Sequence, residues 1–179
     1  PAIRAEVWQG WIMVTLNPEA PLPSVALKGI ADLIPYLDMS TYTETYRESF
    51  NWATNWKVLA ENFMESYHLP MCHAGTIGGA SNLNEMICPE GTEAFNYHWI
   101  LKNDSVPLAL AHPSNTTLEG EERRKTWLLA IYPSLLITLT PGYFWYLSLT
   151  PDGPGRVNVL FGMGMSADCQ IPVESPVRF

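Results

Sequence analysis

His68 and His73 are the residues of this 179-residue chain whose types and spacing indicate metal chemistry. On an unbroken helix, side chains five residues apart point about 140° away from each other, so the two imidazoles could not share a ligand. Pro70 disfavours helical backbone at the residue before it, so we expect the helix to stop near residue 69. A turn there can bring His73 back towards His68. Two neutral imidazoles with a carboxylate oxygen form a set suited to Fe(II), with open positions for oxygen and substrate.

The carboxylates before His68 also have a simpler interpretation, as part of a solvated helix face. Four polar residues follow one another at spacings of four, four and three: Lys57, Glu61, Glu65 and His68. Charged stripes usually face water, and a Lys57–Glu61 pair would contribute only about 0.2–0.5 kcal/mol. The continuation into His73 through a helix-breaking proline is the observation that supports the metal-binding alternative.

One amphipathic helix must position these groups. Thr54 or Asn55 can cap a helix over residues 55–69, along which apolar residues recur at spacings of three and four. These residues are Trp56, Leu59, Ala60, Phe63, Met64 and Tyr67. They predict one buried face.

The rest of the chain is predicted to form mainly strands. β-rich or alternating segments are residues 7–16, 41–50, 95–101, 126–132, 135–140, 143–150 and 156–163, with a short helix at 24–37 and a long loop at 74–94. Together they predict an α+β fold, an antiparallel sheet with a long helix packed across it.

Composition indicates one globular domain with a substantial core. Hydrophobic residues make up 47% of the chain, and the net charge of −8 disfavours nucleic acid and anionic membrane surfaces as partners. The apolar stretch 127–150 contains two prolines, so it predicts strands rather than a membrane-spanning helix. Three cysteines without a CxxC pair fit reduced thiols in a cytoplasmic protein.

Two further segments have competing interpretations. His98 alternates with Phe95, Tyr97 and Trp99 along a strand, and we expect a hydrogen-bonded histidine in or beside the sheet rather than a pocket residue. The aromatic run 143–146 could help form a cation-binding cage, but aromatic residues in sheets more often belong to the core.

The string NWKVLAENFMESYHLPMCH, residues 55–73, resembles the signature of Rieske-type non-haem iron oxygenase large (alpha) subunits. The segments 5–22, 132–136 and 149–155 resemble other parts of the catalytic domain of that family, so the resemblance spans most of the chain.

The resemblance implies a START-like helix-grip fold and a role for each residue of the motif. His68 and His73 would be two of three ligands to a mononuclear Fe(II). Glu65 would hydrogen-bond a ligand histidine and bridge to the iron–sulfur domain of a neighbouring subunit. Asn62 would lie close to the iron. A glutamate rather than an aspartate at the bridging position resembles the branch that acts on quaternary ammonium compounds such as choline, glycine betaine and carnitine.

Two departures from the family pattern concern its metals. The chain has no Cys-x-His and Cys-x-x-His pair, so the [2Fe-2S] Rieske cluster would belong to an N-terminal domain outside residues 1–179. The third iron ligand of the family is an aspartate on a C-terminal helix, which the prolines of the tail make unexpected here. Asp168 and Glu174 are conceivable substitutes, but we expect surface tail residues. The chain is thus predicted to be a single, partial catalytic domain that holds iron loosely or not at all.

The function implied by the resemblance is that of an O2-dependent oxidoreductase. In the parent enzyme, electrons from a reductase or ferredoxin would pass through the Rieske cluster and Glu65 to the iron, and O2 would hydroxylate or demethylate a small aromatic or quaternary ammonium substrate. A homotrimer is expected from the resemblance. The alternative is a non-catalytic helix-grip module that binds a small ligand.

Overall fold

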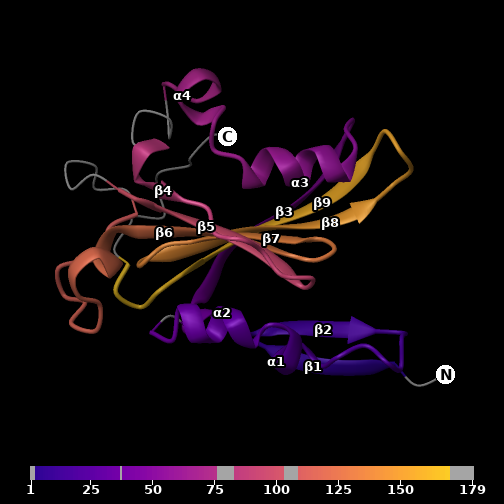
Figure 1. Ribbon diagram of the computed structural model, residues 1–179, viewed down its shortest axis with the longest axis horizontal. Coiled ribbons are helices and arrows are strands. Elements are labelled where there is room, and N and C mark those ends of the chain that lie inside the picture. The colour runs from indigo at the N-terminus through magenta and orange to yellow at the C-terminus, as the bar shows by residue number, and fades with distance from the viewer. Residues whose placement is uncertain (1–2, 37, 76–82, 103–108, 170–179) are drawn as a thin grey trace.

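A seven-stranded antiparallel sheet forms the centre of the molecule (Figure 1). The computed structural model describes residues 3–36, 38–75, 83–102 and 109–169. The strands of this sheet are β3 (Thr43–Trp52), β4 (Met86–Ile87), β5 (Phe95–Leu101), β6 (Lys125–Ile131), β7 (Leu135–Leu139), β8 (Tyr143–Pro151) and β9 (Val157–Met165). Their spatial order is β3-β9-β8-β7-β6-β5-β4.

The first strand of this sheet in sequence pairs with the last. In β3, Thr43 lies opposite Met165 of β9, and Trp52 lies opposite Val157. From β4 to β9, each strand pairs with the next one along the chain. The sheet is therefore a meander with β3 added at the β9 edge.

Helical segments and a hairpin cover the two faces of the sheet. The helix α3 (Trp56–Met64) follows β3 and lies across one face. The opposite face is covered by the hairpin of β1 (Arg4–Trp8) and β2 (Trp11–Thr15) and by the short helices α1 (Pro23–Ala26) and α2 (Lys28–Leu33) (Figure 1). The α+β architecture predicted from the sequence is confirmed.

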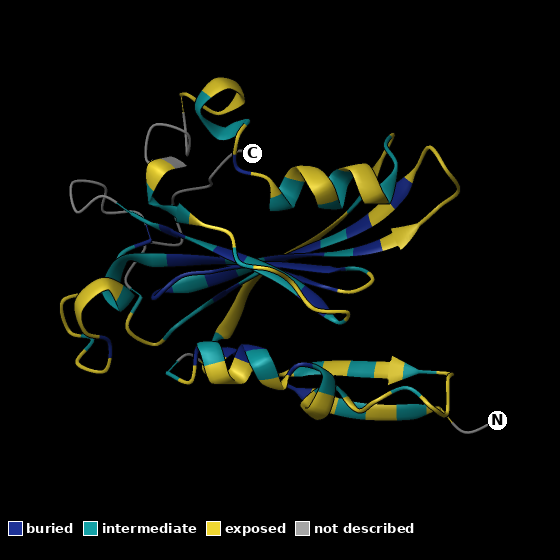
Figure 2. Cartoon of the chain, viewed as in Figure 1, coloured by how far each residue is buried: buried dark blue, intermediate teal, exposed yellow. Residues whose placement is uncertain are grey.

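Alternation along the strands divides the core into two layers, one on each side of the sheet (Figure 2). In β8, Phe144 and Tyr146 face the hairpin, where Trp11 packs edge-on against Tyr146 with ring centroids 4.6 Å apart. Trp145 faces the other side and meets Phe63 of α3, with centroids 5.4 Å apart. The aromatic run 143–146 is thus split between the two layers and does not form one cage.

Two glycines of β9 make room for the aromatic residues of β8. Gly164 lies opposite Phe144, and Gly162 lies opposite Tyr146. A Cβ on Gly164 would come within 2.6 Å of the Phe144 ring, and one on Gly162 would come still closer to the Tyr146 ring. The aromatic side chains therefore cover the bare backbone of the neighbouring strand.

Asn55 caps α3, as the sequence predicts. Its Oδ1 accepts a hydrogen bond from the backbone N–H of Lys57 at 2.9 Å, and its Nδ2 donates to the carbonyl oxygen of Pro154 at 2.8 Å. The second bond ties the start of α3 to the turn between β8 and β9. The apolar face of α3 packs on the sheet as expected, but Tyr67 lies beyond the helix and is 79% exposed.

The prediction that Pro70 ends this helix is wrong. The helix ends at Met64, because Glu65 has extended backbone (φ −102°, ψ 135°). Pro70 instead lies in the first turn of a separate one-turn helix, α4 (Leu69–Cys72). Proline is tolerated there because the amide hydrogens of a first helical turn have no partner within the helix.

Three other elements differ from the predictions. Residues 7–16 form part of the β1–β2 hairpin, which turns at Gln9 and Gly10 with positive φ angles of 50° and 86°. The predicted helix at 24–37 is the pair α1 and α2. The predicted loop at 74–94 contains a 3-10 turn (Leu83–Glu85) and β4, and its residues 76–82 lie outside the described part of the chain.

The remaining strand predictions, from 41–50 to 156–163, are confirmed to within a few residues. Cys72, Cys88 and Cys169 are all free thiols, as expected. None of the helices in the described ranges is long and apolar enough to cross a membrane.

Candidate metal centre

His68 and His73 lie at the two ends of α4. His68 is the residue before its first turn, and His73 is the residue after its last. Because α4 has only four residues, its ends are close together, and the two imidazole rings have centroids 5.3 Å apart with an angle of 67° between their planes. The structure thus brings the two rings together, although by a short helix rather than by the turn that the sequence predicts.

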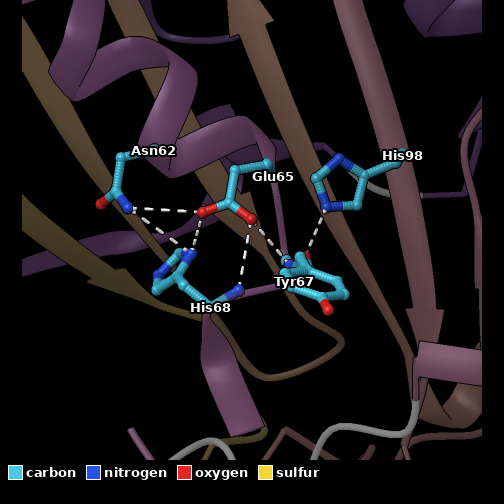
Figure 3. Close-up of polar contacts among 6 residues, drawn as sticks. Asn62, Glu65, Tyr67, His68 and His98 are labelled. Atoms are coloured by element: carbon cyan, nitrogen blue, oxygen red, sulfur yellow. Dashed lines mark hydrogen bonds and ion pairs between the residues drawn. The ribbon is translucent and has the colours of Figure 1, made fainter. Parts of the chain in front are cut away.

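Glu65 organises the segment between α3 and α4 (Figure 3). Its Oε2 accepts the backbone N–H of Tyr67 at 2.8 Å and that of His68 at 3.2 Å. Its Oε1 contacts Nδ1 of the His68 ring. Partial burial acts to raise the pKa of Glu65, but the hydrogen bonds from His68 and Tyr67 outweigh it and leave the pKa below its ordinary value.

The contact with Glu65 determines which tautomer of His68 can coordinate a metal. An ionised carboxylate only accepts hydrogen bonds, so Nδ1 of His68 carries the proton and the lone pair is on Nε2. A carboxylate that holds the far nitrogen of a histidine is the usual support for a metal ligand, because it fixes the orientation of the ring and raises its basicity. His68 can therefore bind a metal ion through Nε2.

Asn62, on the last turn of α3, reaches the same pair of side chains (Figure 3). Its Nδ2 lies 3.4 Å from Oε1 of Glu65 and 3.5 Å from Nδ1 of His68. Since Nδ1 donates its proton to the carboxylate, the amide of Asn62 can donate only to Glu65. Asn62 thus adds a second donor to the carboxylate that orients His68.

The polar stripe predicted on the helix separates into two groups. Lys57 and Glu61 are exposed on α3, as the solvated-face interpretation predicts, and Lys57 Nζ lies 5.6 Å from the centroid of the Trp56 ring. The side chain of His68 is only 19% exposed, and that of Glu65 is 45% exposed. Only the second group contributes to the candidate site.

A buried hydrogen bond attaches this segment to the sheet. The Ser66 hydroxyl lies 3.1 Å from Nε2 of His98 on β5, and both residues are almost fully buried (Figure 3). Burial lowers the pKa of His98 to about 4, so its imidazole is neutral near pH 7. The expectation of a hydrogen-bonded histidine in the sheet is confirmed. Ser66 was not identified from the sequence. Its one local signal was that a short polar side chain stands between Glu65 and His68.

The described residues bring two imidazoles close together but contain no complete set of metal ligands. Within them, no group of three or more His, Cys, Asp or Glu side chains is arranged to hold a metal ion. Asp168, one conceivable third ligand, instead accepts a hydrogen bond from Nδ2 of Asn115 at 3.3 Å. Glu174, the other, lies outside the described residues. The site therefore fits part of an iron centre, namely two imidazoles of which one is oriented by a carboxylate.

Comparison with known families bears on what this arrangement is for. Residues 39–168 match the family model of the ring-hydroxylating alpha subunit, catalytic domain. The chain belongs to this family. The matched region includes β3 to β9 and the whole segment of Asn62, Glu65, His68 and His73. The resemblance seen in the sequence is thereby confirmed.

Solved structures of ring-hydroxylating and related Rieske oxygenases have the same fold. The quaternary ammonium Rieske monooxygenase CntA in complex with the inhibitor MMV12 matches with a TM-score of 0.71 and 14% identity, over 94% of this chain and 43% of the CntA chain. CntA in complex with L-carnitine matches with a TM-score of 0.68 and 13% identity, over 90% and 40%. Naphthalene 1,2-dioxygenase with indole bound matches with a TM-score of 0.62 and 16% identity, over 94% and 44%.

The chain spans about two fifths of the length of these structures. No curated protein sequence matches it. What the comparisons establish is the ring-hydroxylating alpha-subunit family and its α+β catalytic-domain fold.

Proposed function

We propose that this chain is the iron-holding part of an O2-dependent oxygenase, with His68 and His73 as two ligands of a mononuclear Fe(II). The observation that carries the proposal is the pair of rings 5.3 Å apart at the ends of α4, one of them held at Nδ1 by Glu65. Family membership supports iron as the metal. When bound, the iron would supply the activation of O2 for oxidation of a small organic substrate.

The side chains around the histidines would each have a distinct task. Glu65 holds the Nδ1 proton of His68 and keeps the Nε2 lone pair available to the metal, and Asn62 fixes the carboxylate of Glu65. The remaining ligand, a carboxylate, would come from residues outside the described ranges. Two imidazoles and one carboxylate leave positions open for oxygen and substrate.

Glu65 also has the exposure needed for a role between subunits. Almost half of its side chain is accessible, although both of its oxygens bond His68. In the parent protein it would carry the electron path from a [2Fe-2S] Rieske cluster, held by a domain outside this chain and reduced by a reductase or ferredoxin. This route would cross a subunit boundary in a homotrimer.

The substrate would be a small organic molecule, aromatic or quaternary ammonium. CntA has been solved with L-carnitine and with γ-butyrobetaine, and naphthalene 1,2-dioxygenase with indole. A glutamate at position 65 is the feature of this chain that favours a quaternary ammonium substrate. A non-catalytic ligand-binding module is not favoured, since the matched family is a catalytic domain.

The ligand assignment can be tested on the full-length parent protein. Anaerobic Fe(II) loading, followed by removal of free metal, should leave one mononuclear iron per chain in the wild type, in addition to any cluster iron, and none in a His68→Ala, His73→Ala double variant. His112→Ala removes an imidazole whose Nδ1 bonds the nearby Ser114, and it should keep the wild-type iron content. Equal iron in the wild type and the double variant would refute the assignment.

A further inference from the structure

Ser66 is buried in a segment whose neighbours are exposed. Only 1% of Ser66 is accessible, whereas Tyr67 on one side is 79% exposed and Glu65 on the other is classed as exposed. Its hydroxyl lies 3.1 Å from Nε2 of His98, a residue 32 positions away in the sequence. Ser66 is thus the point at which the connection between α3 and α4 contacts the interior of the sheet.

The backbone of Ser66 also belongs to the start of α4. Its carbonyl oxygen accepts the N–H of Leu69 at 3.2 Å, and the carbonyl oxygen of Leu69 accepts the N–H of His73 at 3.0 Å. A chain of hydrogen bonds therefore leads from His98 through Ser66 and Leu69 to His73. His68 lies within the same turn.

A one-turn helix does not hold its own geometry in water, because nucleating a helical turn costs more than its few hydrogen bonds return. At the beginning of α4, Ser66 is buried and bonds His98 of the sheet, whereas residues 71–75 at the other end are exposed. The beginning of α4 is thus where this turn is attached to the core, and this contact can order the turn that carries both rings.

His98 is well suited to be that anchor. It lies in β5, opposite Leu128 of β6, and is 2% exposed. Its ring is neutral near pH 7, with one N–H and one lone pair, and a serine hydroxyl can donate or accept, so the pair is satisfied in either tautomer. Removing either partner leaves a buried polar group without a bond.

We propose that Ser66 and His98 form a positioning pair, which holds the start of α4 against β5 and thereby sets the spacing of His68 and His73. Neither residue touches the metal in this scheme. The consequence for iron binding rests on the proposed function, but the effect on the order of α4 does not.

The first test measures backbone amide hydrogen exchange of residues 67–73 in the metal-free full-length protein. Ser66→Ala and His98→Phe should each raise exchange in this segment by about tenfold or more, with β6–β8 unchanged. Ser66→Thr and His98→Gln, which keep a hydrogen-bonding group, should stay near the wild type. Thr126→Val is the matched control, since it removes a buried hydroxyl of the sheet that has no hydrogen-bond partner among the described residues. Unchanged exchange in 67–73 for Ser66→Ala would overturn the proposal.

The second test measures the Fe(II) dissociation constant by competition with a chelator. Loss of a group that orients metal ligands typically weakens binding by about 10–100-fold, so Ser66→Ala and His98→Phe should fall in that range. The double variant should bind Fe(II) no more weakly than whichever single variant binds it less tightly, because both substitutions break the same hydrogen bond. If the losses of Fe(II) affinity in the two single variants multiply in the double variant, the pairing is overturned. It is also overturned if the single variants bind Fe(II) as tightly as the wild type.

The two tests separate the failure of this proposal from the failure of the proposed function. If the wild-type protein binds no mononuclear iron, the proposed function is contradicted. Hydrogen exchange of residues 67–73 still shows whether Ser66 and His98 hold the start of α4. If His98→Phe does not fold, the comparison of Ser66→Ala with Ser66→Thr decides it, since these changes alter the site by only a few atoms.

Discussion

The carboxylate of Glu65 bonds His68 twice, through the imidazole Nδ1 and through the backbone N–H of the same residue. The two bonds use different oxygens, so the carboxylate fixes both the ring and the main chain that carries it. A metal ligand supported in this way has little rotational freedom to lose when it binds.

Replacing Glu65 by Gln should weaken Fe(II) binding by about tenfold or more, because the charged acceptor of the Nδ1 proton is lost while the shape of the side chain is kept. The dissociation constant in the full-length protein, measured by chelator competition, checks this. Glu61→Gln removes an exposed carboxylate from the last turn of α3 and should leave the affinity unchanged. Equal effects of the two changes would mean that general negative charge, and not the contact with His68, matters.

Acid should destabilise the folded chain through His98. Above pH 6.5 this histidine is neutral in both the folded and unfolded states and adds no pH dependence. Between pH 6.5 and about 4 only the unfolded chain takes up the proton, so the free energy of unfolding should fall by up to about 3 kcal/mol as the pH drops. Urea unfolding of residues 1–179 at pH 7, 5.5 and 4.5 measures the slope.

The matched variant for this pH dependence is His98→Gln, which cannot titrate in this range but can still bond Ser66. Its unfolding free energy should fall less steeply between pH 6.5 and 4 than that of the wild type. A His98→Gln slope that equals the wild-type slope would contradict the assignment.

Alanine at Gly164 should destabilise the chain by about 1–3 kcal/mol, because its Cβ would overlap the Phe144 ring and both lie in strands that cannot move apart freely. The free energy of unfolding in urea is the measurement. Gly155→Ala serves as the control, since no atom lies within 4 Å of the added Cβ there. Similar losses at both positions would indicate a propensity effect and not a clash.

Alanine at Asn55 should cost about 1 kcal/mol through loss of the α3 cap, and more if the bond to Pro154 also contributes. Asn55→Asp separates the two bonds, because aspartate still accepts from Lys57 but cannot donate to the carbonyl of Pro154. The difference in unfolding free energy between the two variants gives the value of the cap, and the difference between the wild type and Asn55→Asp gives the value of the link between α3 and the β8–β9 turn. If Asp and Ala are equally destabilising, the cap contributes nothing.

Much of the fold was predictable because its strands alternate plainly. In β8, successive side chains face opposite core layers, and the cap of α3 is a local pattern that depends on Asn55 alone. The turn at Gln9 was not predictable in this way, because glutamine rarely adopts a positive φ and the residues on both sides of the turn favour strands.

The candidate site was predictable in its members and not in its geometry. Pro70 both breaks a preceding helix and starts a new one, and the sequence cannot distinguish these two effects. Where α3 ends depends on Glu65, whose carboxylate binds the amides of the next turn, and on Ser66, whose partner is 32 residues away. Such a long-range contact leaves no local pattern.

The pairing of β3 with β9 has a consequence for biosynthesis. Within the described part of the chain, β9 is the last strand to leave the ribosome, and until it emerges β3 has no neighbour on which to align. α3 follows β3 directly and rests on core residues that β9 contributes. The histidines are therefore translated early, but they can reach their final separation only after β9 has been made.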